Sequence, residues 1–484
     1  MVGLSKSRIL LHRQCPKRLW LQANRPELAG EDAGATARMA AGTRVGEVAR
    51  DLYPGGVLIE ESTLSQALAS TATELARARR PVFEATLEAD GVLVRVDLLL
   101  PDKRRYRIVE VKSATSVKDY YLEDAAVQAW VAREAGVPLS RVEIAHINSA
   151  FIYPGDLDYR GLFTHVDVTE AIAPLVEEVP IWSQEARETL AGGEPAVEVG
   201  DQCSTPFACP FQNYCWPPAD PDSFPPEILP RGRKTAAQLR SDGFADLRDV
   251  PEGHLSNATH IRIWRASATG EIELNRAAAE LLRSLPFSRY FLDFETIQFA
   301  VPIWAGTRPY MQIPFQWSCH VEDATGNVTH REFLAGGNGD PRRPFVDSLI
   351  AALDRDGPIF VYNAGFEGAR MKELGAAFPE AAPQLDAAIA RFVDLLPLTR
   401  DNYYHPAMRG SWSIKAVLPT IAPELSYDQL EVADGGTAMQ AFAEMLSPDC
   451  DEERVTNLRR SLLAYCERDT LALVRLTRFL EEAD

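Results

Sequence analysis

The 484-residue chain has no apolar run near the ~20 residues of a membrane-spanning helix, and residues 1–15 hold no signal-peptide core. We therefore expect a cytoplasmic protein without a membrane partner. Cysteine is sparse and odd in number, seven in all, which favours a reducing compartment and metal ligation over a disulfide framework. Lys and Arg total 50 against 69 Asp and Glu, a net charge of −19, which disfavours broad electrostatic attachment to nucleic acid.

Four of the seven cysteines form a pattern that reaches across the N-terminal part of the chain. Cys203, Cys209 and Cys215 have five residues between each pair, and Cys15 stands far upstream. If the four bind one metal centre, they join the first and last parts of an N-terminal domain. Thiolates in this number suit an iron–sulfur cluster and also suit structural zinc.

Length and local composition divide the chain. A chain of 484 residues exceeds one ordinary core and predicts two or three domains. After Trp216 the sequence runs PPADPDSFPPEILPRG, which has too much proline for a helix or a central strand, and a polar helical segment follows. We expect three parts, which are an N-terminal domain at 1–216, a proline-rich linker with a helical connector at 217–285, and a C-terminal domain at 286–484.

The sequence pattern of the N-terminal domain predicts helices followed by a mixed sheet. Ser5 or Ser7 can cap a first helix that ends near Asn24 and contains Cys15. Asp90-Gly91 between two apolar runs is a strong hairpin signal. The expected order is helices at 36–52 and 62–79, strands at 81–88, 92–100 and 106–112, a helix at 120–134 and a strand at 142–147. Mixed sheets with helices on their faces are built in this way.

Acidic residues and a lysine mark the first candidate site. Glu110 and Lys112, two residues apart on a strand, project from one face, and the neighbouring strand can bring Asp97 beside them. Two carboxylates hold a hard divalent cation such as Mg²⁺ or Mn²⁺, and a nearby lysine can orient the attacking water or balance phosphate charge. The alternative is an exposed edge with ordinary charge pairs.

A second acidic group is spread over the C-terminal domain. Asp293 and Glu295 interrupt a hydrophobic strand on one face, Glu367 opens a later helix, and Tyr465 and Asp469 share a helix face at i and i+4. Burying like charges is costly unless a cation compensates them. The four acids can hold two metal ions, one activating water and the other stabilising the leaving oxygen, with Tyr465 positioning the water.

Other segments of this domain carry weaker predictions of structure and function. Strands are expected near 312–320, 327–334 and 358–362, with a helix near 343–354. Tyr404, His405, Trp412 and Lys415 could grip the end of a nucleic-acid strand, although such aromatic residues are as often loop packing. Asp394 is assigned to structure. The connector at 234–285 can hold a nucleic-acid backbone or serve only as a spacer.

The N-terminal motifs resemble a known family. Asp97, Glu110 and Lys112, with the four cysteines and the string CPFQNYC, are similar to the RecB-like PD-(D/E)xK iron–sulfur nucleases found among CRISPR-associated proteins and helicase–nuclease subunits. This resemblance implies a restriction-endonuclease-like mixed sheet, metal ligation by Asp97 and Glu110, and a 4Fe–4S cluster on Cys15, Cys203, Cys209 and Cys215. The family has a histidine ligand where this chain has Gly46, for which Glu47 or Glu84 could substitute. Gln128 matches a glutamine of the family.

The C-terminal motifs resemble the DEDD exonucleases of ribonuclease H-like fold, in the subgroup whose last motif is Tyr-x-x-x-Asp. The resemblance implies an α/β mixed sheet, metal ligation by Asp293, Glu295, Glu367 and Asp469, and action at 3′ ends. Glu367 departs from the aspartate usual in that family. The order of the two modules resembles a bacterial two-module nuclease family whose substrate is not assigned.

These expectations combine into one hypothesis and two alternatives. The hypothesis is a bacterial deoxyribonuclease that uses Mg²⁺ or Mn²⁺ in both domains and acts on single-stranded DNA in repair or defence. The first alternative keeps the chemistry and changes the substrate to RNA. The second is a non-catalytic DNA-binding module with a structural cluster and decayed nuclease sites.

Overall fold

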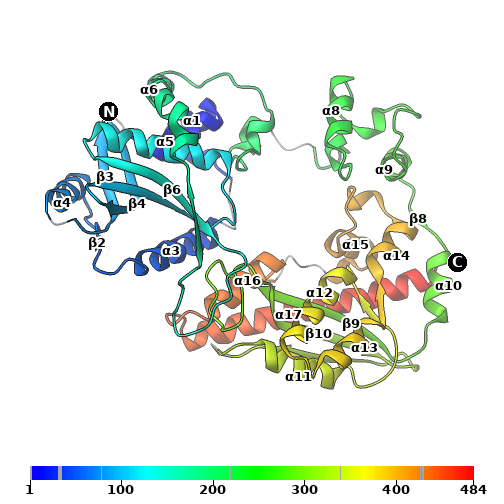
Figure 1. The fold of residues 1–484 in the computed structure, drawn as a ribbon. Helices are drawn as coiled ribbons and strands as arrows, with labels where there is room; N and C mark the ends of the chain where they lie inside the picture. Colours follow the sequence, from blue (N-terminus) through cyan, green and yellow to red (C-terminus); the bar gives the residue numbers. More distant parts are fainter. Residues whose placement is uncertain are drawn as a thin grey trace. The chain divides into compact units, whose positions relative to one another are not determined.

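The computed structural model describes the chain except residues 1–2, 31–34, 78, 217–219, 338, 426, 428–429 and 484. Two compact units divide the chain, Met1–Pro218 with Phe299–Met311 (unit 1) and Ala219–Gln298 with Gln312–Asp484 (unit 2). Residues 217–219, where the expected linker begins, lie outside the described residues. No helix in the described part of the chain has the length and apolar character to cross a membrane. Each unit combines helices with a mixed sheet, which confirms the expected α/β class (Figure 1).

The elements predicted for unit 1 occur in the expected order. Its helices are α1 Lys6–Gln14, α2 Pro16–Asn24, α3 Ala35–Asp51, α4 Leu64–Ala76, α5 Asp119–Glu134, α6 Thr169–Ala191 and α7 Gln212–Cys215. Its strands are β1 Leu4–Ser5, β2 Val57–Leu58, β3 Val82–Ala89, β4 Val92–Asp102, β5 Arg105–Lys112, β6 Leu139–Ile147 and β7 Phe163–Asp167. The structure adds β1, β2, β7 and the long helix α6, which the sequence patterns did not indicate.

The sheet of unit 1 has the order β2-β3-β4-β5-β6-β7, with β1 paired to β4. Strands β3, β4 and β5 are antiparallel, whereas β6 runs parallel to β5. Asp90 and Gly91 join β3 to β4 with φ of 46° and 66°, the left-handed conformation that a two-residue hairpin turn requires, which confirms the turn. Helix α5 packs on this sheet through small buried residues, among them Ala125, Ala126 and Ala129.

Cys15 lies between two helices, so the expectation of one helix through it was wrong. Helix α1 ends at Gln14 and α2 begins at Pro16, and Cys15 is extended, with φ −166° and ψ 118°. The reason is Pro16, which cannot donate a helical hydrogen bond and disfavours helical backbone at the residue before it. Ser5 is the residue that caps α1, by accepting from Arg8 N.

Unit 2 contains the connector and the C-terminal elements. Its helices are α8 Arg233–Ser241, α9 Ala258–Thr269, α10 Ala277–Ser284, α11 Arg342–Ala352, α12 Ala364–Ala377, α13 Ala382–Ile389, α14 Leu395–Asn402, α15 Ile414–Ile421, α16 Gly435–Met445 and α17 Glu452–Glu481. Its strands are β8 Glu273–Leu274, β9 Arg289–Ile297, β10 Ile313–Glu322, β11 Val328–Leu334, β12 Ile359–Val361, β13 Phe392–Asp394 and β14 Tyr403–Tyr404.

The main sheet of unit 2 has the order β11-β10-β9-β12-β13. The first three strands are antiparallel, and β12 and β13 run parallel to β9. Because side chains alternate along β9, Tyr290 and Leu292 pack with the core beneath α11, while Phe291 packs with the core that α17 helps to form. Asp293 and Glu295 continue the Phe291 side, so they lie on the face that α17 crosses (Figure 1).

The helical connector shares a hydrophobic core with the C-terminal elements. Leu239 of α8, Ile263 of α9 and Leu282 of α10 belong to the same buried cluster as Phe291 and Tyr403. The segment is therefore an integral part of unit 2 and more than a spacer.

The segment Phe299–Met311, between β9 and β10, belongs to unit 1. Tyr153 N donates to Thr307 O at 2.9 Å, Gly306 N donates to Tyr153 O at 2.8 Å, and Tyr159 Oη donates to Pro302 O at 3.1 Å. The chain therefore passes between the units at three points, and sequence patterns predict only the first of these.

Candidate functional sites

Five residues singled out from the sequence line one pocket in unit 2. Asp293 and Glu295 come from β9, Glu367 from α12, and Tyr465 and Asp469 from α17, around a cavity of about 200 Å³. One oxygen each of Asp293, Glu295 and Asp469 lies within 4.8 Å of the others. The structure thus brings together the four acids and the tyrosine that the sequence indicated for metal-dependent chemistry.

The crowding of acids changes their proton affinity. Burial, with the charges of Asp469 and Glu295, raises the pKa of Asp293 well above its usual range. Burial and Asp469 raise the pKa of Glu295 to about 8. Burial raises the pKa of Glu367 to about 8 and that of Asp469 to about 6. The pocket therefore holds protons or another cation at neutral pH, because several ionised carboxylates would repel one another.

Backbone geometry fixes the position of Glu367. Asn363 precedes α12 in the left-handed region, with φ 83°. Asp394 accepts from the backbone N–H groups of Asn363 and Ala364, each at 3.0 Å, and from Leu396 N, so it has the structural role expected for it. Glu367 is buried, and its Oε2 has no hydrogen-bond partner. A buried carboxylate oxygen without a partner is unusual, and such an oxygen is suited to ligate a cation.

Two further residues act at this pocket, Tyr427, which the sequence did not reveal, and Lys415, which it indicated only as a possible contact to the end of a nucleic-acid strand. Tyr427 donates to Asp469 Oδ1 at 2.5 Å, and this bond offsets part of the rise in the pKa of Asp469 caused by burial. Lys415 lies with its Nζ 5.1 Å from the centre of the Tyr465 ring, and its charge lowers the pKa of Glu295 against the effect of burial. Neither residue stands in a recognisable motif, because α15 and the segment before α16 reach the site only in the fold.

The aromatic residues expected to grip a strand end are mostly in the core, so that expectation was wrong for them. Tyr404 is fully buried and Trp412 nearly so, and their rings lie 5.0 Å apart. His405 caps a short helical turn by accepting from Ala407 N at 3.0 Å. Lys415 alone among the four lines the pocket.

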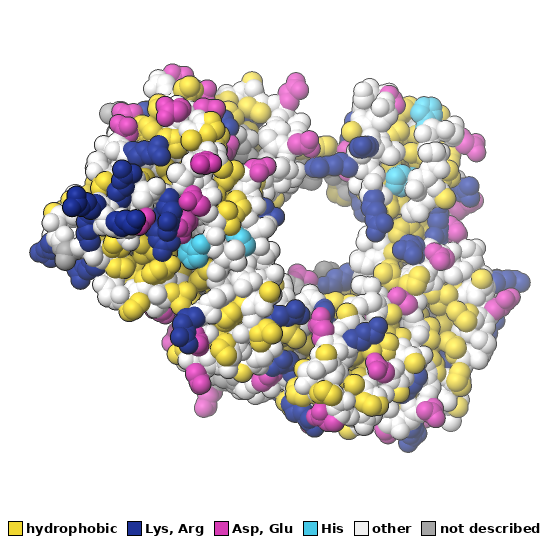
Figure 2. All heavy atoms as spheres, viewed as in Figure 1, with side chains coloured by type: hydrophobic (Ala, Val, Ile, Leu, Met, Phe, Trp, Pro, Cys, Tyr) yellow, Lys and Arg dark blue, Asp and Glu magenta, His cyan; other side chains and the backbone are white. Residues whose placement is uncertain are grey.

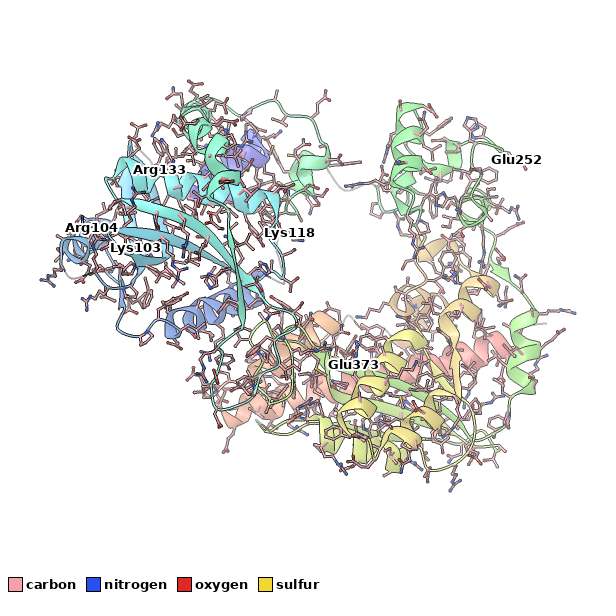
Figure 3. All side chains as sticks on the ribbon, viewed as in Figure 1. Lys103, Arg104, Lys118, Arg133, Glu252 and Glu373 are labelled. Atoms are coloured by element: carbon pink, nitrogen blue, oxygen red, sulfur yellow. The ribbon has the colours of Figure 1, made fainter. Side chains whose placement is uncertain are left out.

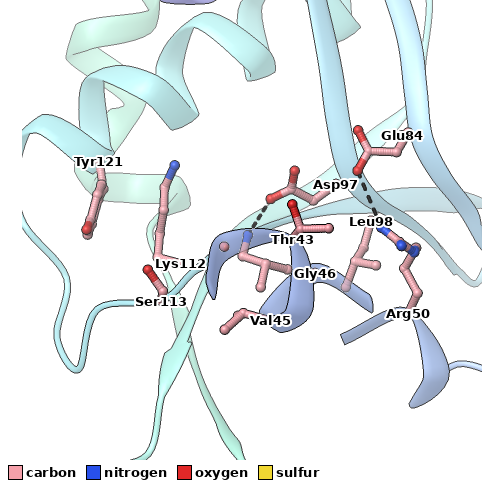
Figure 4. Close-up of a pocket in the computed structure, with 12 residues that line it drawn as sticks. Thr43, Val45, Gly46, Arg50, Glu84, Asp97, Leu98, Lys112, Ser113 and Tyr121 are labelled. Carbon is pink, nitrogen blue, oxygen red and sulfur yellow. Dashed lines mark hydrogen bonds and ion pairs between the residues drawn. The ribbon is translucent and has the colours of Figure 1, made fainter. Parts of the chain in front are cut away.

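The first candidate site lies in a pocket of about 280 Å³ in unit 1. Asp97, Lys112, Glu84 and Gly46 are among its lining residues. Figure 4 shows Asp97 beside the backbone of β5, where its Oδ2 accepts from Val111 N at 2.7 Å. Burial and the charge of Glu110 raise the pKa of Asp97 to about 8.

Glu110 already has protein partners on both oxygens. Its Oε1 lies 2.6 Å from Lys112 Nζ and 3.2 Å from Lys6 Nζ, and Gln128 donates to its Oε2. Asp124 of α5 also binds both lysines, at 2.6 Å to Lys6 and 2.5 Å to Lys112. Although burial opposes it, these carboxylates raise the pKa of both lysines, which stay charged. Lys6 and Asp124 were missed because neither belongs to the short motif.

The two glutamates proposed in place of the family's histidine have different positions. Glu84 lines the pocket and faces Arg50 at 3.7 Å (Figure 4). Glu47 pairs with Arg44 at 3.0 Å and is not among the pocket residues. At Gly46 itself a Cβ would meet only Arg50, at 3.7 Å, so the pocket has room for a side chain there.

The cysteine-bearing segments of unit 1 lie together. Gln14 Nε2, next to Cys15, donates to Gln202 O and Phe207 O, each at 2.7 Å. Burial raises the pKa of Cys209, and the neighbouring thiols Cys15 and Cys203 add to that effect. Among the described residues, no three of these thiols come within 4.8 Å of one another. Tetrahedral zinc would need sulfur atoms ~3.8 Å apart, so the arrangement is more open than a preformed zinc site.

A basic patch lies apart from the first site. Lys103 and Arg104 occupy the turn between β4 and β5, and Figure 2 shows Lys and Arg side chains gathered on this face of unit 1. Lys112 stands at the other end of β5, ~23 Å away for an extended strand. Although Lys103 and Arg104 come shortly before Lys112 in the sequence, they therefore do not lie at the pocket that Lys112 lines.

Comparison with known proteins gives partial matches. A family described as "Domain of unknown function (DUF2779)" matches residues 290–413, which include Asp293, Glu295 and Glu367. Similar proteins are "Uncharacterized protein MG366 homolog" of Mycoplasma pneumoniae, 27% identical over 41% of this chain and 33% of its own, and "Uncharacterized protein UU173" of Ureaplasma parvum, 22% identical over 47% and 36%. "Uncharacterized protein MG366" of Mycoplasma genitalium is 21% identical over 40% and 32%. The chain spans about a third of the length of these relatives.

Proposed function

We propose that the chain is a metal-dependent nuclease whose unit 2 removes nucleotides from the 3′ end of single-stranded DNA. The proposal depends on one observation above all, the convergence of four carboxylates from three elements beside Tyr465 in one pocket. The resemblance to DEDD exonucleases assigns metal ligation to the same four acids. The mixed sheet of unit 2 supports a ribonuclease H-like fold, and that of unit 1 supports a restriction-endonuclease-like fold.

The donor set of unit 2 fits hard divalent cations. Carboxylate oxygens are the ligands that Mg²⁺ and Mn²⁺ prefer. Three of the acids already approach within 4.8 Å, and Glu367 has a buried oxygen without a partner. When bound there, Mg²⁺ or Mn²⁺ would supply Lewis-acid polarisation of the scissile phosphate and neutralise the carboxylates.

The chain's own residues orient the reaction. Burial and the charge of Asp469 raise the pKa of Tyr465 far above its usual range, so the phenol keeps its proton and can hold a water molecule by hydrogen bonding. Tyr427 holds Asp469 in place through their short hydrogen bond. Lys415 supplies a fixed positive charge at the pocket, to which a phosphate of the strand end would be drawn.

For unit 1 the fit to a cation is incomplete. Asp97, Glu110 and Lys112 lie together as the PD-(D/E)xK resemblance requires, but Lys6, Lys112 and Gln128 already satisfy Glu110. We therefore assign cleavage to unit 2 alone. For unit 1, the satisfied Glu110 favours the alternative of a non-catalytic module that binds DNA without cutting it.

The four cysteines fit a 4Fe–4S cluster better than zinc. Four thiols from two distant segments lie close enough to influence one another, yet more widely spaced than zinc requires. We propose that Cys15, Cys203, Cys209 and Cys215 hold such a cluster and tie the two ends of unit 1 together. Iron and sulfide analysis of anaerobically purified protein tests this; zinc in place of iron would refute it.

Labelled oligonucleotides test the nuclease function. Wild-type protein with Mg²⁺ or Mn²⁺ should shorten single-stranded DNA from its 3′ end, and Asp293→Asn should reduce the rate by at least ~10²-fold, because the cation supplies several kcal/mol of transition-state stabilisation. Glu252→Gln, a surface change in the same unit, is the matched control (Figure 3). Activity unchanged in Asp293→Asn would refute the proposal.

Two comparisons refine the assignment. A ribose substrate of the same sequence decides between DNA and RNA. Changing the exposed Lys103 and Arg104 to Gln separates the units, since unchanged cleavage with weaker DNA binding would assign binding to unit 1. We propose DNA repair or defence in the cytoplasm as the biological setting. That setting requires first that the purified protein cleaves DNA.

A further inference from the structure

A third group of possible metal ligands lies in unit 2, outside the acid pocket. It consists of His320 on β10, His330 on β11 and Glu467 on α17, and one ligand atom of each lies within 4.8 Å of the others. The two histidines are direct cross-strand partners, with ring centres 4.6 Å apart. Nδ1 of His330 lies 3.8 Å from Glu467 Oε1.

One nitrogen of each histidine ring forms a hydrogen bond with a hydroxyl group. His320 Nδ1 lies 2.8 Å from Thr470 Oγ1, His330 Nε2 lies 2.8 Å from Ser318 Oγ, and the two hydroxyl oxygens are 2.7 Å apart. Thr470 also donates to the carbonyl oxygen of Glu467 at 3.1 Å.

One assignment of hydrogen-bond donors and acceptors is consistent with all of these distances. With the Thr470 proton on the Glu467 carbonyl, Thr470 Oγ1 accepts from His320 Nδ1 and from Ser318, and Ser318 accepts from His330 Nε2. Both imidazoles are then neutral, and His320 Nε2 and His330 Nδ1 carry free lone pairs. Histidines that bind metals are held in this way, with the second nitrogen donating to a neighbouring acceptor that fixes the tautomer.

We propose that His320, His330 and Glu467 form a binding site for a zinc-class transition-metal ion. Imidazole ligands favour Zn²⁺ and its neighbours, whereas all-carboxylate sites favour Mg²⁺ and Mn²⁺. This site therefore differs in chemistry from the acid pocket. Two histidines and a glutamate make a known three-ligand set for zinc, with water in the fourth position.

The burial and orientation of these side chains suit this assignment. His320 is only 5% exposed, and its Nδ1 is already held by Thr470, so the ring has the fixed orientation that a ligand of a metal needs. Glu467 has a half-exposed side chain, so an ion can reach the site from solvent. The ligand atoms must draw in to ~3.3 Å for tetrahedral zinc, and a change of rotamer of the half-exposed Glu467 side chain can bring its carboxylate closer.

The site would join the β10–β11 hairpin to α17. Glu467 lies between Tyr465 and Asp469 on that helix, so the ion would hold in place the element that carries two residues of the acid pocket. Its expected contribution is to the stability of unit 2, independent of whether the acid pocket hydrolyses nucleic acid.

Cobalt titration of the full-length protein in excess Mg²⁺ tests this site. Excess Mg²⁺ competes with Co²⁺ for the carboxylates of the acid pocket. Co²⁺ bound by nitrogen and oxygen gives visible bands that lack the strong sulfur-to-metal absorption of a cysteine site. Wild type should bind one Co²⁺ in this way, and Zn²⁺ should displace it. His330→Gln and Glu467→Gln should weaken binding by at least ~10²-fold, because changes even in supporting partners cost 10–100-fold. His254→Gln, at an exposed histidine of unit 2, should bind as wild type does.

Two results would overturn the proposal. One is a wild-type titration without these bands. The other is an equal titration in wild type and in Glu467→Gln, a surface change that leaves the core intact. If His330→Gln fails to fold, as judged by circular dichroism, Glu467→Gln alone decides.

Discussion

Removing divalent cations is expected to make the stability of unit 2 fall as the pH rises. The pKa of both Glu295 and Glu367 is raised from 4.5 to about 8, chiefly by burial. Each acid therefore keeps its proton in the fold at pH values where the unfolded chain has lost it. Stability from these groups is fully present below pH ~4.5 and is lost as the pH rises through about 8.

The size of the effect follows from the same shift. One pKa unit corresponds to ~1.4 kcal/mol, so each acid costs on the order of 3 kcal/mol at pH 7 and 5 kcal/mol at pH 9 relative to pH 4.5. The two contributions are not additive, because the acids share one pocket. A loss of ~5 kcal/mol would lower the unfolding midpoint of a unit of this size by about 10–20 °C.

Thermal unfolding followed by circular dichroism measures this effect. In EDTA the midpoint of unit 2 should fall between pH 5.5 and pH 9, and Mg²⁺ should restore most of the loss at pH 9 because it binds the ionised carboxylates. Glu295→Gln cannot ionise, so its midpoint should vary less with pH in EDTA and respond less to Mg²⁺. Glu252→Gln, at an exposed position, should follow wild type.

A midpoint in EDTA that is flat or rises over this pH range would refute the reasoning. So would an Mg²⁺ response that is the same in Glu295→Gln and wild type. Either result would mean that the acids in this pocket ionise without cost and have no need of a cation.

Three further predictions concern single residues. Tyr465→Phe should lower the turnover of 3′-end cleavage by about 10²-fold with little change in Mg²⁺ affinity, since it removes the hydroxyl that positions water; equal turnover would remove Tyr465 from the reaction. Cys209→Ser should lose iron and lower the unfolding midpoint of unit 1, measured by metal analysis and calorimetry, whereas full iron content would exclude Cys209 as a ligand. Gly46→His should tighten Mn²⁺ binding to unit 1 at least ~10-fold in an Asp293→Asn background, measured by calorimetry, because a Cβ at Gly46 meets only Arg50 and the position lines a pocket of about 280 Å³. Unchanged affinity would show that Lys6 and Lys112 keep Glu110 from the cation.

The two acid sites differ in how their charges are balanced. In unit 1, Lys6 and Lys112 stand against Glu110 and Asp124, so the described residues neutralise one another. In unit 2, Lys415 is the one basic side chain among the described residues that line the pocket, which also include four carboxylates. This imbalance is the reason for assigning cleavage to unit 2.

Features set by short-range periodicity could be predicted from the sequence. Alternation along one strand places Asp293 and Glu295 on the same face, and i, i+4 spacing places Tyr465 above Asp469. The Asp90-Gly91 turn follows from the backbone freedom of those residues. The break at Cys15 had a local signal as well, in Pro16, and that signal was overlooked.

Features that depend on distant elements needed the fold. Lys6 reaches Glu110 across more than a hundred residues, and Tyr427 reaches Asp469 from a segment without a motif. No spacing rule describes such pairs, because their separation in the chain is arbitrary.

By itself, the sequence determined the α/β class, the order of the main strands and helices, and the motif acids of each site together with Lys112 and Tyr465, because these depend on local pattern and on residue chemistry. Only the tertiary structure decided which acids already have partners, that Phe299–Met311 packs in unit 1, and that His320, His330 and Glu467 meet. Those outcomes depend on strand register and on the packing of α17 against the sheet, which bring together side chains that no local pattern relates.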